Sequence, residues 1–416
     1  MRARLSHPAA PWQGRAMPTD RIATLDFIRG VAVMGILVAN LPAFGLPEAA
    51  YFSPLAWGGH APADVTVWFA TFVLVEGKMR ALFTFLFGAS MLLVLDRAET
   101  AGRDPASTHL ARMAVLFAIG WLHLYLVWRG DILTHYALIG AVAFVFARLS
   151  VRWLVALGCA FLAWEMLYNA AGAAALFAAG GRDTPEKIAL WNVFAGIFGV
   201  PPAADLRAEI AALGGSWADG VRWRWAHVTD PVTFATLLGP ETLSAMLFGM
   251  AGYRSGLLTG TWPRVRYRRW TIVCLGAALP AYAALGINTV AHGFDQRWVF
   301  LASILASAPF RVLAATGYAC LLVLLFRPGG RLSERVGAAG RAAFTNYLGT
   351  SLIMLALFSG LGLFGQLTRA QLYWLAPPVW LLMLAWSQPW LARFRYGPLE
   401  WLWRSLARAS LQPMRR

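Results

Sequence analysis

The sequence predicts an all-α, polytopic membrane protein with about ten transmembrane helices. Hydrophobic residues make up 59% of the 416 residues, and charged residues only 13%. Apolar runs of about 20 residues recur along the chain, and each is long enough to cross roughly 30 Å of hydrocarbon. A backbone inside lipid must satisfy its own hydrogen bonds, so these runs are expected to form helices.

The expected spans form two groups of five. The first 20 residues, rich in Pro, Ala and Arg, are expected to be a disordered cytoplasmic tail. Five spans follow in the N-terminal membrane half (21–178), then an extracytoplasmic loop (179–231), then five spans in the C-terminal half (232–416). The spans are placed at 22–43, 65–95, 111–128, 132–147, 153–178, 232–252, 270–291, 298–326, 342–364 and 373–391.

The net charge of +16 indicates membrane orientation and not nucleic-acid binding. Only two of the 36 basic residues are lysines, and the arginines gather between the apolar runs. The two alternating sets of connections carry 24 and 8 basic residues, and basic residues favour the cytoplasmic side. Both termini are therefore expected in the cytoplasm. The basic clusters would meet anionic lipid head groups or an anionic cytoplasmic substrate.

The cysteines exclude two common kinds of site. Cys159, Cys274 and Cys320 fall inside apolar runs and lack metal or redox spacing. We therefore expect neither a disulfide nor a metal site.

The first span carries polar residues on one stripe. Asp26 and Arg29 are three residues apart, so they share a helix face and can form an ion pair. Asn40 follows eleven residues after Arg29 and returns to that face about 16 Å along the axis. Charges at membrane depth mark either a substrate path or a structural pair, so the stripe is either a binding surface or an inter-helix clamp.

The third and fourth spans hold the main catalytic candidate. His123 is expected in the outer half of the third span, and the short connection after it requires a tight helical hairpin. The hairpin brings Asp131 and His135 near His123. This is the outline of a general base oriented by a carboxylate, with a buried hydrogen-bonding histidine as the alternative.

Other polar groups are weaker candidates. His60, in the loop before the second span, is the reserve candidate for a reactive histidine. Lys78 lies at membrane depth in 76-EGKMR-80, which is either a substrate contact or an internally paired helix break. Glu165 and Arg311 are isolated charges that each need a partner.

Six ordered blocks resemble the YeiB-like family of bacterial inner-membrane proteins, whose C-terminal half is a domain of unknown function. The resemblance implies a multi-pass protein of the bacterial inner membrane. The blocks are 25-LDFIRGVAVMGILVAN-40 with 42-PAFGLPEAAY-51, 77-GKMRALFTFLFGAS-90, 120-GWLHLYLVWRGDILTHYALIG-140, 246-MLFGMAGYRSGLL-258, 340-GRAAFTNYLGTSLI-353 and 397-GPLEWLWRSL-406.

That family is similar to a wider set of membrane acyltransferases, which includes heparan-alpha-glucosaminide N-acetyltransferase. The shared L-D-x-x-R-G opening is matched here by Leu25, Asp26, Arg29 and Gly30. The resemblance implies transfer of an acyl group from cytoplasmic acyl-CoA, a co-substrate and not a bound cofactor, to a sugar or lipid acceptor. Another branch has histidine eleven residues after the arginine, where this chain has Asn40.

Two hypotheses follow. In an acyltransferase, His123 would deprotonate the acceptor or carry the acyl group, and Asp131 would orient it. In a transporter or lipid-handling protein, the intramembrane charges would line a substrate path without covalent chemistry. Membrane lipids are expected partners in both, and an oligomer is left open.

Arg112, Arg254 and Arg341 are expected to meet coenzyme A phosphates. The other candidate substrate-binding residues are Asp26, Arg29, Asn40, Lys78, His135 and Asn346.

Overall fold

The computed structural model describes residues 22–416, and the tail expected at residues 1–20 lies outside this part of the chain. Within it the protein is all-α, as the sequence predicts, and an isolated bridge between Phe394 and Arg415 is its one β-type pairing. The first half contains α1 (Ala23–Gly45), α2 (Pro62–Leu74), α3 (Lys78–Thr100), α4 (Pro105–Leu126), α5 (Leu133–Ala143) and α6 (Val151–Ala179).

The second half continues the same pattern after three short helices. The expected loop at 179–231 holds α7 (Pro185–Phe198), α8 (Ala203–Leu213) and α9 (Trp217–His227). After it come α10 (Pro231–Arg254), α11 (Arg264–Ala291), α12 (Gln296–Phe300), α13 (Ala308–Leu325), α14 (Arg331–Arg341), α15 (Ala343–Leu355), α16 (Arg369–Leu372), α17 (Ala376–Arg393) and α18 (Pro398–Ala407).

Each of the ten expected spans overlaps a helix, which confirms a polytopic helical membrane protein. In the described residues, eight helices are long and apolar enough to cross a membrane, with α2 and α3 counted as one. The bent pair of α7 and α8 would make a ninth. The fourth expected span is the shorter apolar helix Leu133–Phe146, and the tenth is α17.

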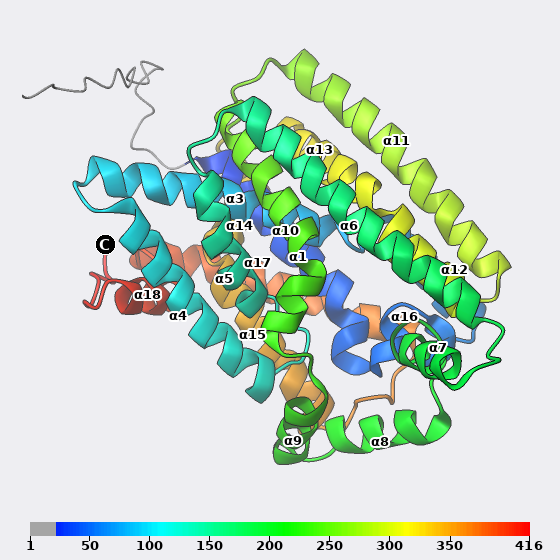
Figure 1. Cartoon of the computed structure of the whole chain (residues 1–416). Coiled ribbons are helices and arrows are strands. Elements are labelled where there is room, and N and C mark those ends of the chain that lie inside the picture. Colours follow the sequence, from blue (N-terminus) through cyan, green and yellow to red (C-terminus); the bar gives the residue numbers. More distant parts are fainter. Residues whose placement is uncertain (1–21) are drawn as a thin grey trace, which may run out of the picture.

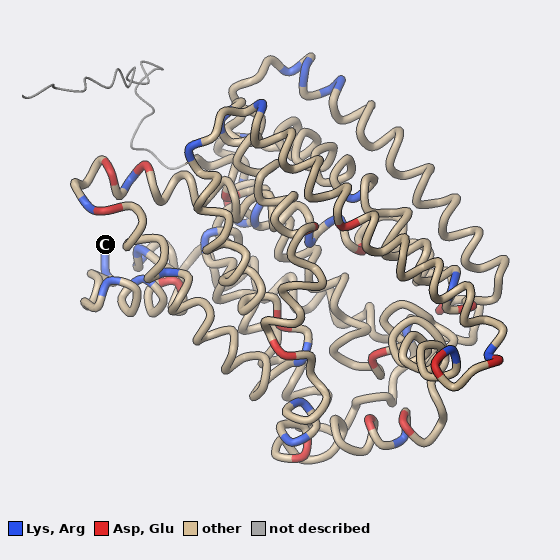
Figure 2. Tube along the Cα trace, in the orientation of Figure 1, with Lys and Arg blue, Asp and Glu red and all other residues tan. Residues whose placement is uncertain are grey.

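The helices run between two ends of the molecule (Figure 1). Basic residues gather at the start of α11 and on α18 at one end, while α7, α8 and α9 lie at the other (Figure 2). This separation agrees with the alternation of basic residues along the sequence.

Glycine allows the central helices to pack backbone to backbone. A Cβ atom on Gly88 of α3 would lie 2.1 Å from the Met246 carbonyl oxygen of α10, and one on Gly249 would lie 2.0 Å from that of Phe85. Small residues at a crossing let membrane helices approach closely. The α3–α10 pair is therefore a fixed frame for the polar groups that these helices carry.

Candidate functional site

A buried histidine–carboxylate pair occupies the α4–α5 hairpin. His123 Nδ1 lies 2.8 Å from Asp131 Oδ1, and both residues are 4% exposed. The second Asp131 oxygen accepts hydrogen bonds from the Thr134 amide at 3.0 Å and the Thr134 hydroxyl at 3.2 Å. Both carboxylate oxygens are thus held, and the contact expected from the sequence between His123 and Asp131 is present.

The other ring nitrogen of His123 is chemically available. A carboxylate only accepts hydrogen bonds, so Asp131 keeps the proton on Nδ1 and leaves a lone pair on Nε2. Nε2 is buried and has no hydrogen-bond partner among the residues that the structure describes. Buried polar atoms are nearly always satisfied, so an open one marks a position for a ligand or a proton.

The two aromatic neighbours of His123 each line a hollow, although His123 itself lines neither. The ring centroids of Trp128 and Tyr347 lie 6.2 and 5.7 Å from that of His123. Trp128 lines the larger hollow, together with residues of α15 and of α9. Tyr347 lines the smaller one, together with Asn40. Phe44 lines both hollows, so the two hollows are adjacent.

The loop helices close the end of the larger hollow. Arg129, which lines it, pairs with Glu209 of α8 and lies 3.7 Å from Glu48. Arg224 of α9 also lines it and donates to the carbonyl oxygens of Tyr125 at 2.9 Å and Leu126 at 3.0 Å. Helices that sequence alone placed in a loop therefore cover the end of α4 that carries His123.

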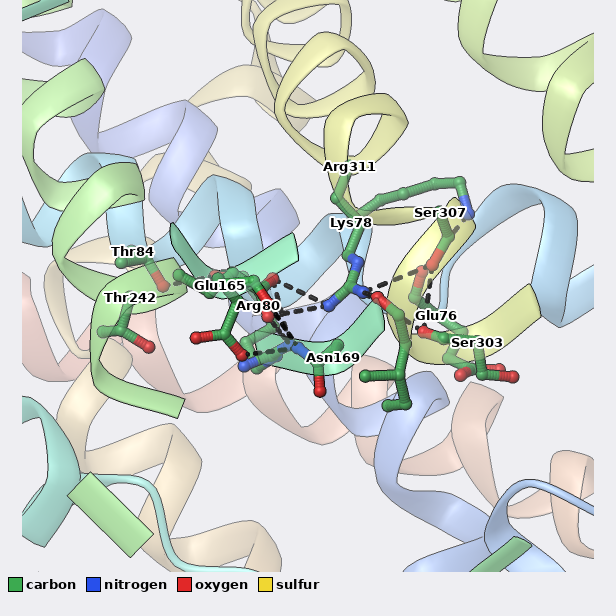
Figure 3. Close-up of polar contacts among 12 residues, drawn as sticks. Glu76, Lys78, Arg80, Thr84, Glu165, Asn169, Thr242, Ser303, Ser307 and Arg311 are labelled. Atoms are coloured by element: carbon green, nitrogen blue, oxygen red, sulfur yellow. Dashed lines mark hydrogen bonds and ion pairs between the residues drawn. The ribbon is translucent and has the colours of Figure 1, made fainter. Parts of the chain in front are cut away.

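A second polar cluster joins α3, α10 and α13 (Figure 3). Arg311 Nη1 of α13 lies 2.7 and 2.9 Å from the two carboxylate oxygens of Glu241 on α10, and Arg80 of α3 approaches both at 3.3 Å. The other terminal nitrogen of Arg311 donates to backbone carbonyls of a π-helical turn, Leu301–Ala306. The partner of Arg311 is thus Glu241, which ties three helices together.

The break between α2 and α3 is internally paired. Lys78 is fully buried, and its ammonium donates to the carbonyl oxygens of Phe72 at 2.7 Å and Glu76 at 3.2 Å. It also lies 3.0 Å from the Tyr282 ring centroid. Lys78 therefore satisfies the carbonyls that the interrupted helix leaves open.

The remaining candidates have other surroundings. His135 is buried, and its Nε2 lies 2.8 Å from the hydroxyl oxygen of Thr242 on α10. Glu165 bonds Asn169 one turn along α6 at 3.0 Å. His60 is exposed in the connection before α2.

The polar residues at the two ends of α1 have different neighbours. Arg29 bonds Asp26 at 3.1 Å and Ser90 of α3 at 2.8 Å, which is the ion pair expected from the spacing. Asn40, at the far end, lines the smaller hollow beside Tyr347. The stripe thus joins an inter-helix clamp to the surroundings of His123.

The candidate phosphate-binding arginines lie apart from the two hollows, and Asn346 is held within the protein. Arg112 stacks on Trp403 at 4.2 Å, and Arg254 donates to the carbonyl oxygens of Ala147 and Leu149. Arg341 ends α14, and none of the three lines either hollow. The amide nitrogen of Asn346 donates to Ala339 and Ser387, and its oxygen accepts from Trp386.

Sequence reasoning missed Tyr347 and Glu241. Tyr347, Thr350 and Ser351 recur at helical spacing on an otherwise apolar span, so their shared face was detectable. Glu241 was the acid available in the sixth expected span to pair with an arginine of another span.

Comparison with known proteins supports the expected family. A family model described as a protein of unknown function (DUF418) matches residues 252–410. The uncharacterized protein YeiB of Escherichia coli (strain K12) is 34% identical over 405 residues, which cover 95% of this chain and 98% of that protein. The uncharacterized protein YxaH of Bacillus subtilis (strain 168) is 28% identical, over 96% of this chain and 97% of that protein. The chain belongs to the YeiB-like family of multi-pass helical membrane proteins.

Proposed function

We propose that this protein is a membrane acyltransferase, located in the bacterial inner membrane, that moves an acyl group from acyl-CoA to a sugar or lipid acceptor. The observation that carries the proposal is the buried His123–Asp131 pair with an open Nε2. A transferase of this kind needs a base inside the membrane, and a carboxylate-held imidazole is such a base.

The reaction balances with groups from the chain and the two substrates. The acceptor hydroxyl or amine gives its proton to His123 Nε2 as its oxygen or nitrogen attacks the thioester carbonyl carbon. The new bond to carbon forms, the carbon–sulfur bond breaks, and His123 returns the proton to the leaving thiolate. Asp131 holds the imidazole in the required tautomer and stabilises its charged form. Transfer through an acyl-imidazole at Nε2 is the alternative route.

The surroundings suggest where the substrates bind. The larger hollow beside Trp128, with Arg129 and Arg224 in its lining, supports entry of a polar acceptor from the end covered by α8 and α9. The basic end of the molecule suits the phosphates of coenzyme A, and Arg112, Arg254 and Arg341 remain the proposed contacts there.

The test is release of coenzyme A thiol by the purified protein in lipid nanodiscs. Acetyl-CoA is supplied with a panel of alkyl glycosides, and products are identified by mass spectrometry. A general base contributes about 10²- to 10⁴-fold, so H123A is expected to lose at least about 100-fold in turnover. H227A is the matched control, because His227 lies exposed on α9, stacked on Trp223. Equal turnover in H123A and the wild type would remove His123 from the site.

One observation favours the alternative of a transporter or lipid-handling protein. The α2–α3 break beside the Glu241 cluster has the form of the interrupted helices that line transport sites. A transporter would move a labelled solute across proteoliposomes without releasing thiol. Its flux would then depend on Glu241 and not on His123.

A further inference from the structure

Two buried and unpartnered polar atoms belong to adjoining rings. His123 Nε2 and the Tyr347 hydroxyl both lack a hydrogen-bond partner among the described residues. The two rings lie 5.7 Å apart, centroid to centroid, and Tyr347 is 7% exposed. The backbone amide of Ile132 is a donor toward the Tyr347 hydroxyl oxygen, so the hydrogen of that hydroxyl still has no acceptor among the described residues. A buried hydroxyl without a partner is destabilising, so it calls for one.

We propose that Tyr347 donates a hydrogen bond to the acceptor oxygen that His123 deprotonates, and that the acceptor is therefore a hydroxyl group and not an amine. The proposal rests on the proposed acyltransferase function. It makes Tyr347 a second catalytic residue and the protein an ester-forming enzyme.

The number of lone pairs decides between the two acceptors. A hydroxyl oxygen has two lone pairs and one hydrogen. Its hydrogen can point to His123 Nε2, one lone pair can accept from Tyr347, and the other remains to attack the thioester carbonyl. When the proton moves to His123, the hydrogen bond from Tyr347 stabilises the negative charge that develops on the oxygen.

An amine cannot react while it satisfies both the Tyr347 hydroxyl and His123 Nε2. A neutral amine nitrogen has one lone pair, and that pair must attack the carbonyl carbon. A hydrogen bond from Tyr347 would occupy it and suppress the reaction. If the amine donated to Tyr347 instead, the phenolic hydrogen would remain without an acceptor in a buried place, which is costly.

The fold holds Tyr347 in this position. Its helix α15 begins where the Glu400 carboxylate of α18 accepts hydrogen bonds from the amides of Phe344 at 2.8 Å and Thr345 at 3.2 Å. Tyr347 also lines the smaller hollow, together with Asn40, Thr350 and apolar side chains.

The experiment compares two acceptors that differ in one group. Octyl β-D-glucopyranoside offers only hydroxyls, and octyl 2-amino-2-deoxy-β-D-glucopyranoside adds an amine at carbon 2. Each is incubated with acetyl-CoA and the nanodisc protein, and the products are treated with hydroxylamine, which cleaves esters and spares amides. We expect ester products from both acceptors.

Tyr347→Phe separates chemistry from folding. Loss of one donor to a developing oxyanion costs about 10²- to 10³-fold in kcat, with KM for acetyl-CoA unchanged. The melting temperature should hold or rise, because the removed hydroxyl has no partner. Tyr267→Phe is the control. Its hydroxyl donates to the carbonyl oxygens of Gly256 and Leu257, so its loss should lower stability and leave kcat unchanged.

The outcomes distinguish the two proposals. Amide products, or a Y347F variant with wild-type kcat, would overturn the hydroxyl assignment while leaving acyl transfer in place. Ligand-induced thermal shifts give a second readout, since the glucoside should protect the wild type more than Y347F. No thiol release and no shift with either glycoside would overturn both the acyltransferase and this inference.

Discussion

Gly340 of α14 and Gly30 of α1 meet at a backbone contact that leaves no room for a side chain. A Cβ atom on Gly340 would lie 1.9 Å from the Asp26 carbonyl oxygen and 2.5 Å from the Gly30 amide nitrogen. In the other direction, a Cβ on Gly30 would lie 2.0 Å from the Val336 carbonyl oxygen. The glycine in the L-D-x-x-R-G opening therefore serves helix packing, beside the Asp26–Arg29 pair.

Gly340→Ala is expected to destabilise the protein. The methyl group forces α1 and α14 apart, and overpacking of this kind costs about 1–3 kcal/mol. Gly337→Ala on the same helix is the control, because no atom lies within 4 Å of its Cβ position and alanine favours the helix. Thermal unfolding in nanodiscs measures both. Equal melting temperatures for the two variants would contradict the contact.

Removal of one partner from the Arg311–Glu241 pair should be strongly destabilising. Arg311→Met leaves the buried Glu241 carboxylate with Arg80 as its remaining ion-pair partner among the described residues, and breaking a buried ion pair costs about 3–5 kcal/mol. The double variant R311M/E241M should cost less than the sum of the two single variants. A double-mutant cycle on the exposed pair Arg222–Asp219 should give a coupling free energy near zero. Additive effects at Arg311 and Glu241 would show that the pair is not coupled.

Asp131→Asn should impair catalysis without loss of the fold. An amide in place of the carboxylate can donate to Nδ1, which moves the imidazole proton to Nε2 and removes the base. We expect turnover to fall by up to about the 10²- to 10⁴-fold that a general base contributes. Thr134→Val, which removes one hydrogen bond to Asp131, should have a smaller effect of the same kind. Thiol release measures kcat for both variants, and the loss of kcat should be larger for Asp131→Asn than for Thr134→Val.

Glu400 gives the protein a stability that depends on pH. Burial raises the pKa of the Glu400 carboxyl above its ordinary value of 4.5, so the folded protein holds this proton more tightly than the unfolded chain. The stability from that proton is complete below about pH 4.5 and is lost as pH rises through the folded-state pKa. Glu400→Gln should remove this dependence. If the melting temperatures of E400Q and the wild type changed with pH in the same way, the predicted role of Glu400 would be contradicted.

The orientation in the membrane is open to cysteine labelling. A cysteine at Val200, between α7 and α8, should react with an impermeant maleimide from outside the cell. A cysteine at Gly102, between α3 and α4, should react only after the membrane is opened. Both positions lie in connections, and no atom lies within 4 Å of a Cβ at Gly102. Reaction of residue 200 from the cytoplasm alone would reverse the topology.

The sequence predicted what depends on local spacing. The ten apolar runs became helices, because lipid requires internal hydrogen bonding of each run. The Asp26–Arg29 pair and the His123–Asp131 contact both lie within one helix turn or one hairpin. For such pairs, the spacing along the chain determines the distance in space.

Contacts between distant segments were not predictable in this way. Arg311 and Glu241 are 70 residues apart, and no periodicity links α13 to α10. Tyr347 approaches His123 from a span more than 200 residues along the chain, and only tertiary packing brings the two rings together. The coverage of α4 by α8 and α9 also depends on tertiary packing, through Arg129 and Glu209.

The proposed reactive centre does not coincide with the region that the family model matches. The matched region, 252–410, contains Tyr347 and Glu400 but neither His123 nor Asp131. A fragment with that region alone would retain the tyrosine and its supporting helix and lack the base. A gene fusion or truncation at residue 252 would separate two groups that the proposed mechanism needs together.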